Sequence, residues 1–319
     1  MFKNIINQIK EKQPSLLVVG DLMLDKYIFG DVERISPEAP VPIVTLKNEE
    51  QMLGGCGNVI RNLNNLGVGI SLISAVGKDS VGDSLKGKLS RMGIPISNIL
   101  SIEDTRTTEK MRIVANKQQI ARVDWDMDSS KINHDNLINK NIQKSINSVD
   151  GIIVSDYAKG VCSNSLIKKI IQLAKNVSVP IFIDPKGKNW EKYKNANLIT
   201  PNTKEAELII GKRLKNDQDF EHAGSMICSS FNIDACLITR GNEGMTLVSK
   251  KETLHIKSRA KEIFDVSGAG DTVISAMAIG LVLNLNYDQA IEFSNEAAGV
   301  VVGHIGTSAI TIPELLNLK

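Results

Sequence analysis

The stretch Asp265-Val-Ser-Gly-Ala-Gly-Asp271 runs directly into an apolar segment that begins at Thr272. The small residues Gly-Ala-Gly allow another molecule to approach the backbone closely. The apolar segment predicts a buried helix, whose first N–H groups lack partners inside the helix and whose dipole adds partial positive charge. The loop and the helix start together predict an anion-binding cradle with the Asp271 carboxylate at its edge.

A carboxylate beside a bound phosphate is suited to accepting a proton from an attacking hydroxyl, so this stretch indicates phosphoryl transfer to an alcohol. A tight turn in which Asp271 only caps the helix fits the same residues. A dinucleotide-binding fingerprint does not fit, because Val273 stands where its third glycine is needed. The phosphate-loop pattern near Gly82 also fails, because Leu89 replaces the Ser or Thr that binds magnesium.

The bulk composition predicts a globular protein and argues against several classes of partner. The 319 residues are 42% hydrophobic, and no linker divides them, so we expect a single domain over residues 1–319. A net charge of +2 without a basic tract argues against nucleic acid as a partner. No apolar run reaches membrane-spanning length. Four cysteines without a Cys-x-x-Cys pair favour reduced thiols and a cytoplasmic location.

Short apolar strands alternate with helical patterns, which predicts an α/β fold with a mainly parallel central sheet covered by helices on both faces. The predicted strands are Leu16–Val19, Ile70–Val76, Gly151–Ser155, Ile181–Asp184, Leu198–Thr200, Ala235–Thr239 and Met245–Ser249. The predicted helices are Asn58–Leu66, Gly82–Met92, His134–Ser148, Ser163–Lys175, Glu205–Ile210, Phe220–Ser230, Thr272–Leu283 and Asp288–Val302.

Two stretches interrupt this alternation. Residues 27–51 are rich in proline near their centre, and residues 105–124 alternate apolar and polar side chains. Both patterns indicate extended strands outside the α/β layers. We expect them to pair as a small β-sheet that forms a lid over the active face.

Several polar residues follow predicted strands, at the edge where open parallel sheets bind ligands. Asp21, with Asp25 four residues later, follows the first strand, and we expect the Asp21 carboxylate to accept hydrogen bonds from sugar hydroxyls. Asp156, Asp184, Asn202 and Thr239 follow later strands. A turn or helix cap is the ordinary role of any one such residue. Their gathering at one edge together with Asp271 favours a site.

Two further motifs open helices at this edge. Gly54 and Gly55 precede Asn58, so backbone can approach a ligand while Asn58 orients it, although an ordinary glycine-rich loop fits equally well. Asn202 and Glu205 are spaced i, i+3, and Glu205 could hold Mg²⁺ through water. A cap at the start of the helix is the alternative for this pair.

Positive side chains in the lid and near the sheet edge could meet a phosphate on the substrate. They are Lys110, Arg112, Arg122 and Lys186. For each of them alone, a solvated surface position is the ordinary alternative.

These motifs, in this order, resemble the ribokinase-like, or PfkB, carbohydrate kinases over essentially the whole chain. The resemblance implies the ribokinase-like three-layer α/β fold, with Gly268, Ala269 and Gly270 as the anion hole and Asp271 as the general base. Because a helix N-terminus favours the ionised carboxylate, we expect Asp271 to act as a base near neutral pH. The implied ATP site consists of Asn202, Thr203, Lys204, Glu205, Thr239, Gly241 and Asn295.

A finer resemblance is to the D-glycero-β-D-manno-heptose 7-phosphate kinases. It rests on the segments Arg34–Pro42, Thr107–Asp124, Val154–Gly160, Asp184–Gly187 and Ala297–Gly303. The implied reaction is ATP-dependent phosphorylation of the anomeric hydroxyl, which feeds the synthesis of ADP-heptose and the lipopolysaccharide core. The implied substrate residues are Asp21, Gly54, Gly55, Asn58, Lys110, Arg112, Arg122, Asp184 and Lys186.

The resemblance also implies ATP with Mg²⁺, a possible monovalent cation, and a homodimer paired through the lids. Many such kinases are fused to an adenylyltransferase half with a His-x-Gly-His motif, and this chain ends before that motif could occur. Two alternatives remain open at this point: a kinase for another sugar or sugar phosphate, and a sugar-binding sensor without catalysis. Retention of Asp271 with its glycines argues against the sensor.

Overall fold

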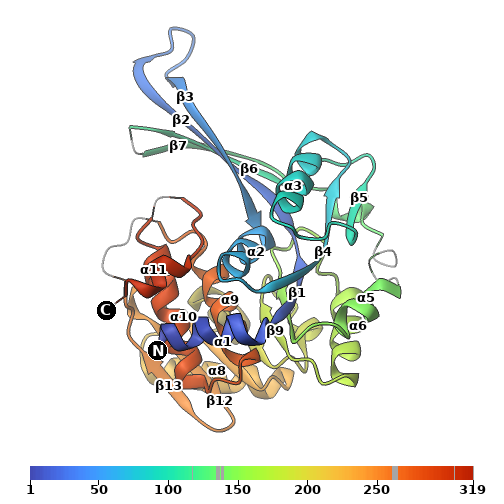
Figure 1. The fold of residues 1–319 in the computed structure, drawn as a ribbon. Coiled ribbons are helices and arrows are strands. Elements are labelled where there is room, and N and C mark those ends of the chain that lie inside the picture. Colours follow the sequence, from blue (N-terminus) through green and yellow to red (C-terminus); the bar gives the residue numbers. More distant parts are fainter. Residues whose placement is uncertain (117, 134–136, 138–139, 261–264, 305, 319) are drawn as a thin grey trace.

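The computed structural model describes residues 1–319 except 117, 134–136, 138–139, 261–264, 305 and 319, so the predicted helix over 134–148 lies partly outside the described residues. The described chain forms a central sheet in the order β13-β12-β11-β10-β9-β8-β1-β4-β5 (Figure 1). Strands β12 and β13 are antiparallel at one edge, and the other strands pair in parallel. The strands are β1 (Ser15–Gly20), β4 (Gly69–Gly77), β5 (Ile99–Ile102), β8 (Gly151–Ser155), β9 (Ile181–Asp184), β10 (Leu198–Ile199), β11 (Ala235–Thr239), β12 (Met245–Ser249) and β13 (Thr253–Ile256).

Both faces of this sheet are buried. In β1, Leu16 and Val18 pack into one core, while Leu17 and Val19 pack into the other. The first core is covered by α1 (Phe2–Lys12), α2 (Cys56–Asn65), α3 (Ser80–Arg91), α9 (Ala269–Val282), α10 (Tyr287–Val301) and α11 (Ile312–Leu316). The second is covered by α5 (Lys140–Ile146), α6 (Asn164–Asn176), α7 (Thr203–Ile210) and α8 (Asp217–Phe231). This confirms the predicted α/β fold, since continuous apolar strands are those buried on both faces.

A second sheet of four strands, in the order β3-β2-β6-β7, projects from the carboxyl edge of the body (Figure 1). Its strands are β2 (Leu22–Ile35), β3 (Pro42–Gly55), β6 (Glu109–Ala115) and β7 (Gln118–Trp125). The predicted pairing of the two irregular stretches is confirmed, although β2 begins at Leu22 rather than near residue 27. Because β2 starts right after β1, the lid is anchored directly at the sheet edge.

Four elements were not predicted as regular structure: α1, β5, β13 and α11. Strands β5 and β13 have only four residues each, and β13 alternates between exposed and half-buried positions, so neither produces a long apolar run. Helix α11 has five residues and is stabilised by a capping box between Thr311 and Glu314. Among the described helices, none combines the length and apolar character needed to cross a membrane.

Candidate active site

Asp271 lies in the first turn of α9, which begins at Ala269 rather than at the predicted Thr272. Its carboxylate is 3% exposed and accepts two hydrogen bonds. Asn58 Nδ2 donates to Oδ2 over 3.0 Å, and the Tyr157 hydroxyl donates to Oδ1 over 2.9 Å. The N–H groups of this turn lack carbonyl acceptors within the helix, so they can bind an anion. The predicted anion-binding cradle and the Asp271 carboxylate therefore lie at the same helix start.

The pKa of Asp271 is raised to about 6, mainly by burial, while the hydrogen bonds from Asn58 and Tyr157 oppose the rise. Desolvation of the buried carboxylate is the largest of these influences, and the expectation that Asp271 acts as a base near neutral pH stays a prediction. The carboxylate remains mostly ionised at neutral pH, as a general base requires.

Gly268 caps α9 with a φ of 85°, in the left-handed region. A Cβ built on Gly268 would lie 2.5 Å from Asn58 Nδ2. Glycine at this position therefore allows both the sharp entry into α9 and the approach of Asn58 to Asp271. Arg61 orients the same amide, because its Nη1 donates to Asn58 Oδ1 over 3.3 Å and to the carbonyl oxygen of Thr307 over 2.9 Å.

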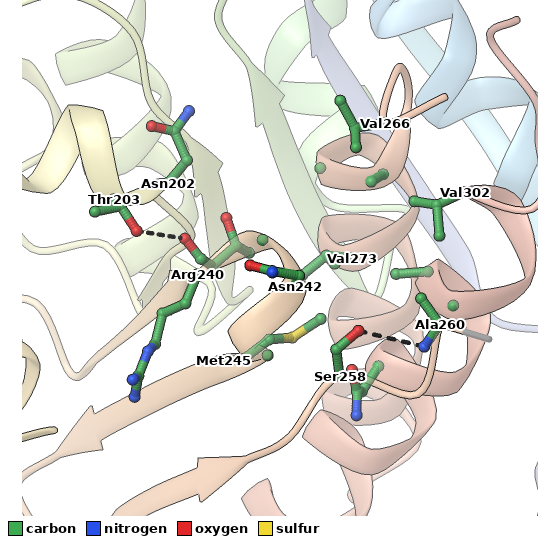
Figure 2. A pocket seen from close by; sticks show the side chains of 18 of the residues that line it. Asn202, Thr203, Arg240, Asn242, Met245, Ser258, Ala260, Val266, Val273 and Val302 are labelled. Carbon is green, nitrogen blue, oxygen red and sulfur yellow. Dashed lines mark hydrogen bonds between the residues drawn. The ribbon is translucent and has the colours of Figure 1, made fainter. Parts of the chain in front are cut away.

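A cavity of about 540 Å³ opens between the α9 start, α10 and the loops after β10, β11 and β13 (Figure 2). Val266, Val273 and Val302 line it on one side, and Asn202 and Thr203 lie across from them (Figure 2). The predicted ATP residues that line it are Asn202, Thr203, Lys204, Thr239, Gly241 and Asn295. Arg240, Asn242, Met245, Ser258 and Ala260 also line it and were missed, partly because β13 was not predicted.

A smaller cavity of about 140 Å³ adjoins it, and Gly270 lines both. Glu205 lies here and forms the capping box that was the alternative to a metal role: it accepts the Asn202 N–H, while Asn202 accepts the Glu205 N–H. Lys186 Nζ lies 2.7 Å from Glu205 Oε1. Lys186 is therefore placed beside the nucleotide cavity rather than with the lid cations. Burial and the neighbouring carboxylates raise the pKa of Asp184 well above its usual range.

Asp21 requires a correction, because its carboxylate is used by the protein itself. It is 1% exposed and accepts the N–H groups of Tyr157, Lys159 and Val161 over 2.9, 3.1 and 2.9 Å. These bonds fix the loop after β8. The predicted grip on sugar hydroxyls by Asp21 is thus not what this geometry supports.

The second aspartate, Asp25, is also buried, and its carboxylate contacts side chains instead of the loop after β8. Arg112 Nη1 lies 2.8 Å from its Oδ1, and a Cβ built on Gly54 would lie 2.3 Å from its Oδ2. Gly54 is therefore needed to make room for the Asp25 carboxylate, and Gly55, with a φ of 58°, turns the chain into α2. The sequence spacing of Asp21 and Asp25 did not reveal which of the two carboxylates is bound by the loop after β8.

The lid cations gather around Asp25 and Tyr157. Arg112 and Arg122 are cross-strand partners, and Arg122 is paired with Asp124 at 2.6 Å. Lys110 Nζ lies 5.4 Å from the centre of the Tyr157 ring. Burial lowers the pKa of Lys110, and the nearby cations Lys159, Arg112 and Arg122 lower it further. Of these cations, Lys110 is close enough to Asp271 to lower the pKa of its carboxyl.

A family profile described as pfkB family carbohydrate kinase matches residues 13–315. The chain belongs to this family. It is therefore a PfkB-family carbohydrate kinase. The match spans both the α/β body and the lid, so the site described above lies wholly inside it.

Among PfkB relatives, the chain is similar to bifunctional proteins named HldE. It is 40% identical over 97% of its length to HldE of Aliarcobacter butzleri and covers 65% of that protein. It is 39% identical over 96% of its length to HldE of Haemophilus influenzae and covers 63% of it. The chain thus spans a little under two thirds of these relatives.

Solved structures support the same fold. Arabidopsis thaliana ribokinase complexed with ribose and ATP superimposes with a TM-score of 0.74 at 18% identity, covering 96% of this chain and 99% of that one. Escherichia coli phosphofructokinase-2 in complex with potassium has a TM-score of 0.77 at 18% identity, covering 96% and 97%. At this identity the likeness establishes the ribokinase-like fold.

Proposed function

We propose that this PfkB kinase transfers the γ-phosphoryl group of ATP to the anomeric hydroxyl of D-glycero-β-D-manno-heptose 7-phosphate, in the synthesis of ADP-heptose and the lipopolysaccharide core. The observation that carries the chemistry is the position of Gly270. It lines both cavities and directly precedes Asp271, so the backbone next to the proposed base borders both cavities. The similarity to HldE proteins and the heptose kinase segments supports the choice of sugar.

The larger cavity suits a nucleotide. Its apolar side, with Val266, Val273 and Val302, suits an adenine ring, and its polar side suits ribose and phosphates (Figure 2). The phosphates would then point toward Gly270 and the first turn of α9, whose free N–H groups favour anions.

The residues around the smaller cavity fit Mg²⁺, which prefers carboxylate oxygens and retained water. Glu205 and Asp184 would hold the ion, Glu205 through water because both of its oxygens already have partners. The Asp184 carboxylate accepts no hydrogen bond among the described residues, and burial together with the neighbouring Asp271 and Glu205 carboxylates raises its pKa. When bound, Mg²⁺ offsets charge on the β- and γ-phosphates.

A role for a monovalent cation is tested by comparing turnover in potassium and tetramethylammonium chloride.

In the transfer step, Asp271 accepts the proton of the anomeric hydroxyl as its oxygen forms a bond to the γ-phosphorus. The bond between that phosphorus and the β,γ-bridging oxygen breaks, and ADP leaves with the electron pair. The proton stays on the Asp271 carboxyl until solvent removes it. Backbone N–H groups from Gly268 to Gly270 stabilise the charge on the transferring group. The lid sheet over the site would exclude water.

The 7-phosphate of the sugar is assigned to the lid cations. Arg112 is already paired with Asp25 and Arg122 with Asp124, whereas Lys110 has no carboxylate partner among the described residues. Lys110 is therefore the cation most available to a new anion. Asp25 would accept hydrogen bonds from sugar hydroxyls near it.

A panel of acceptors tests this proposal. Purified protein is given ATP, Mg²⁺ and one sugar at a time, and ADP release is measured. We expect efficient turnover with the heptose 7-phosphate and much slower turnover with ribose, adenosine or fructose 6-phosphate. Equal rates with unphosphorylated sugars would contradict the role given to the lid cations, and no turnover with any acceptor would favour a sensor.

The assembly and location of the protein also remain proposals. Ile35, Val41 and Leu46 are exposed apolar residues on the projecting lid, which supports a homodimer paired through the lids. Sedimentation of the wild type and of a Leu46→Glu variant tests this. An adenylyltransferase partner, fused or separate, is proposed because the HldE relatives are longer. We expect a cytoplasmic protein, since its four cysteines are free thiols.

A further inference from the structure

Tyr157 follows directly after β8, and nothing described so far assigns it a role in the reaction. Its hydroxyl donates to Asp271 Oδ1 over 2.9 Å, opposite the donation from Asn58 to Oδ2. Its ring is covered by the lid, because Lys110 Nζ lies 5.4 Å from the ring centre. Tyr157 therefore links the catalytic carboxylate to the loop after β8.

We propose that Tyr157 is a positioning residue that holds the Asp271 carboxylate in its reactive orientation and keeps it ionised at neutral pH. With Asn58 and Tyr157 each bonded to a different oxygen, the carboxylate cannot rotate without breaking a buried hydrogen bond. Each carboxylate oxygen has a second lone pair, so one remains for the sugar hydroxyl. Orientation of this kind is a recognised source of rate enhancement.

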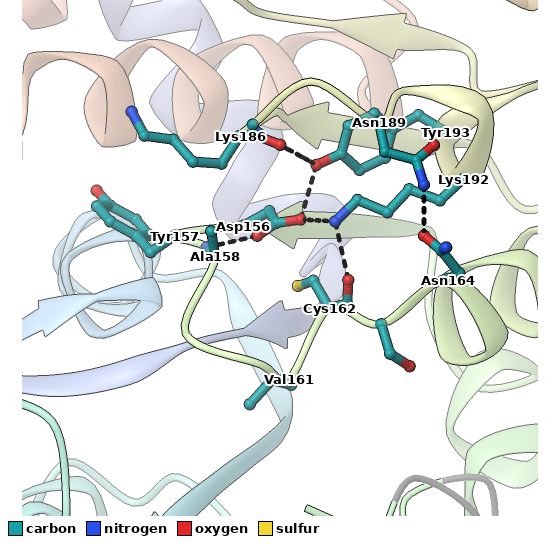
Figure 3. Close-up of polar contacts among 12 residues, drawn as sticks. Asp156, Tyr157, Ala158, Val161, Cys162, Asn164, Lys186, Asn189, Lys192 and Tyr193 are labelled. Atoms are coloured by element: carbon teal, nitrogen blue, oxygen red, sulfur yellow. Dashed lines mark hydrogen bonds and ion pairs between the residues drawn. The ribbon is translucent and has the colours of Figure 1, made fainter. Parts of the chain in front are cut away.

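The loop that carries Tyr157 is fixed on both sides. The Tyr157 N–H is bonded to Asp21, and the preceding residue, Asp156, accepts bonds from Lys192 and from the Tyr193 hydroxyl (Figure 3). Ala158 has a φ of 55°, and its N–H is bonded to the Asp156 side chain. The Tyr157 hydroxyl is thus held at the end of a pinned loop rather than being free to reorient.

The hydroxyl also acts electrostatically. Burial and the Asp271 charge raise the pKa of Tyr157 well above its usual range, so this hydroxyl stays protonated and remains a donor. A hydrogen bond to the ionised carboxylate lowers the pKa of Asp271 against the effect of burial. The other charged or titratable groups that act on Asp271 are Asp25 from β2, Lys110 from β6, Asp184 from β9, and Cys56 and Arg61 from α2.

The test uses Tyr157→Phe, which removes the hydroxyl and keeps the ring under Lys110. The matched control is Tyr287→Phe, which removes the hydroxyl of a half-buried tyrosine at the start of α10, outside both cavities and outside the loop after β8. We expect Tyr157→Phe to lose about 10-fold in kcat at pH 7 with an unchanged KM for ATP. The acidic limb of the pH–rate profile of Tyr157→Phe should move upward by about one pH unit, whereas Tyr287→Phe should keep the wild-type profile.

A second readout needs no sugar. It therefore tests the role of Tyr157 separately from the proposed function, on which the choice of sugar depends. The carboxyl carbon of Asp271, assigned by its loss in Asp271→Asn, is titrated by ¹³C NMR. We expect a pKa near 6 in the wild type and a higher one in Tyr157→Phe. An unchanged Asp271 titration in folded Tyr157→Phe would overturn the inference, even if the heptose assay succeeds. If the Asp271 titration shifts in Tyr157→Phe but the wild type has no activity on the heptose phosphate, the role of Tyr157 stands and only the proposed substrate is wrong.

Discussion

We propose Asp271 as the group that accepts the proton of the attacking hydroxyl. Its carboxylate is buried and fixed by two donors, and it stands beside the first N–H groups of α9. Asp271→Asn keeps the shape and removes the base, so we expect kcat to fall by about 10²- to 10⁴-fold while the protein still binds ATP. Turnover and nucleotide binding are measured together with the melting temperature. A folded variant with near-normal turnover would show that another group is the base.

The pH dependence follows from the same carboxylate. Its pKa is raised to about 6, and only the ionised form accepts a proton. Activity should therefore be full above pH 7 and fall about 10-fold per pH unit below 6. The measurement is kcat/KM for the sugar from pH 5 to 8. A plateau that extends down to pH 5 would contradict the burial argument.

Lys110 is expected to bind the phosphate already present on the sugar. Lys110→Met should raise the KM for the sugar phosphate by about 10-fold or more, because it removes a charge-assisted contact, and leave the KM for ATP unchanged. Lys26→Met is the matched control, since Lys26 lies on the neighbouring lid strand β2 and is paired with Glu49. Equal effects of the two substitutions would point to lid stability instead of phosphate binding.

At the residue scale, the sequence predicted which residue types carry the chemistry better than it predicted which residues contact one another. Asp271, Asn58 and Gly268 were proposed from residue type and helix starts, and the structure brings them together at the start of α9. The sequence suggested Asp21 for the sugar hydroxyls. It could not show that the Asp21 carboxylate binds the backbone of the loop after β8. Tyr157 was missed because only the folded chain brings β8 next to α9.

At the scale of elements, the capping box of α7 has two roles that can be separated. Asn202 caps α7 and also lines the nucleotide cavity, whereas Asn286 forms an equivalent box on α10 away from that cavity. We expect Asn202→Ala and Asn286→Ala each to cost about 1 kcal/mol of stability. Only Asn202→Ala should also raise the KM for ATP. A parallel increase in Asn286→Ala would mean that loss of stability alone weakens nucleotide binding.

The buried strands of the body were predictable because apolar runs between helical patterns are specific to sheets covered on both faces. The lid strands within 105–124 were predicted from period-2 patterning and those within 27–51 from a proline-rich break in the alternation, although not their full length. Short edge elements such as β5 and β13 were not, because four residues carry too little pattern. This is why the far side of the nucleotide cavity, near Ser258, was absent from the predicted site.

At the scale of the whole molecule, a parallel sheet explains why residues distant in sequence converge. The carboxyl ends of β1, β8, β9 and β11 lie along one edge, and the lid extends from that edge directly after β1 (Figure 1). That convergence was predictable from the fold class. The contact between the lid and the loop after β8, Lys110 over Tyr157, was not, since only the folded chain brings these two segments together.

The central claim is that this fold phosphorylates the anomeric oxygen of a heptose 7-phosphate. The most direct measurement is ³¹P NMR of the product formed from ATP and the heptose 7-phosphate by the purified protein. The account predicts a second phosphate on C1, giving the 1,7-bisphosphate together with one ADP per sugar, and no product with Asp271→Asn. Phosphate on another carbon, or an unchanged sugar, would contradict it.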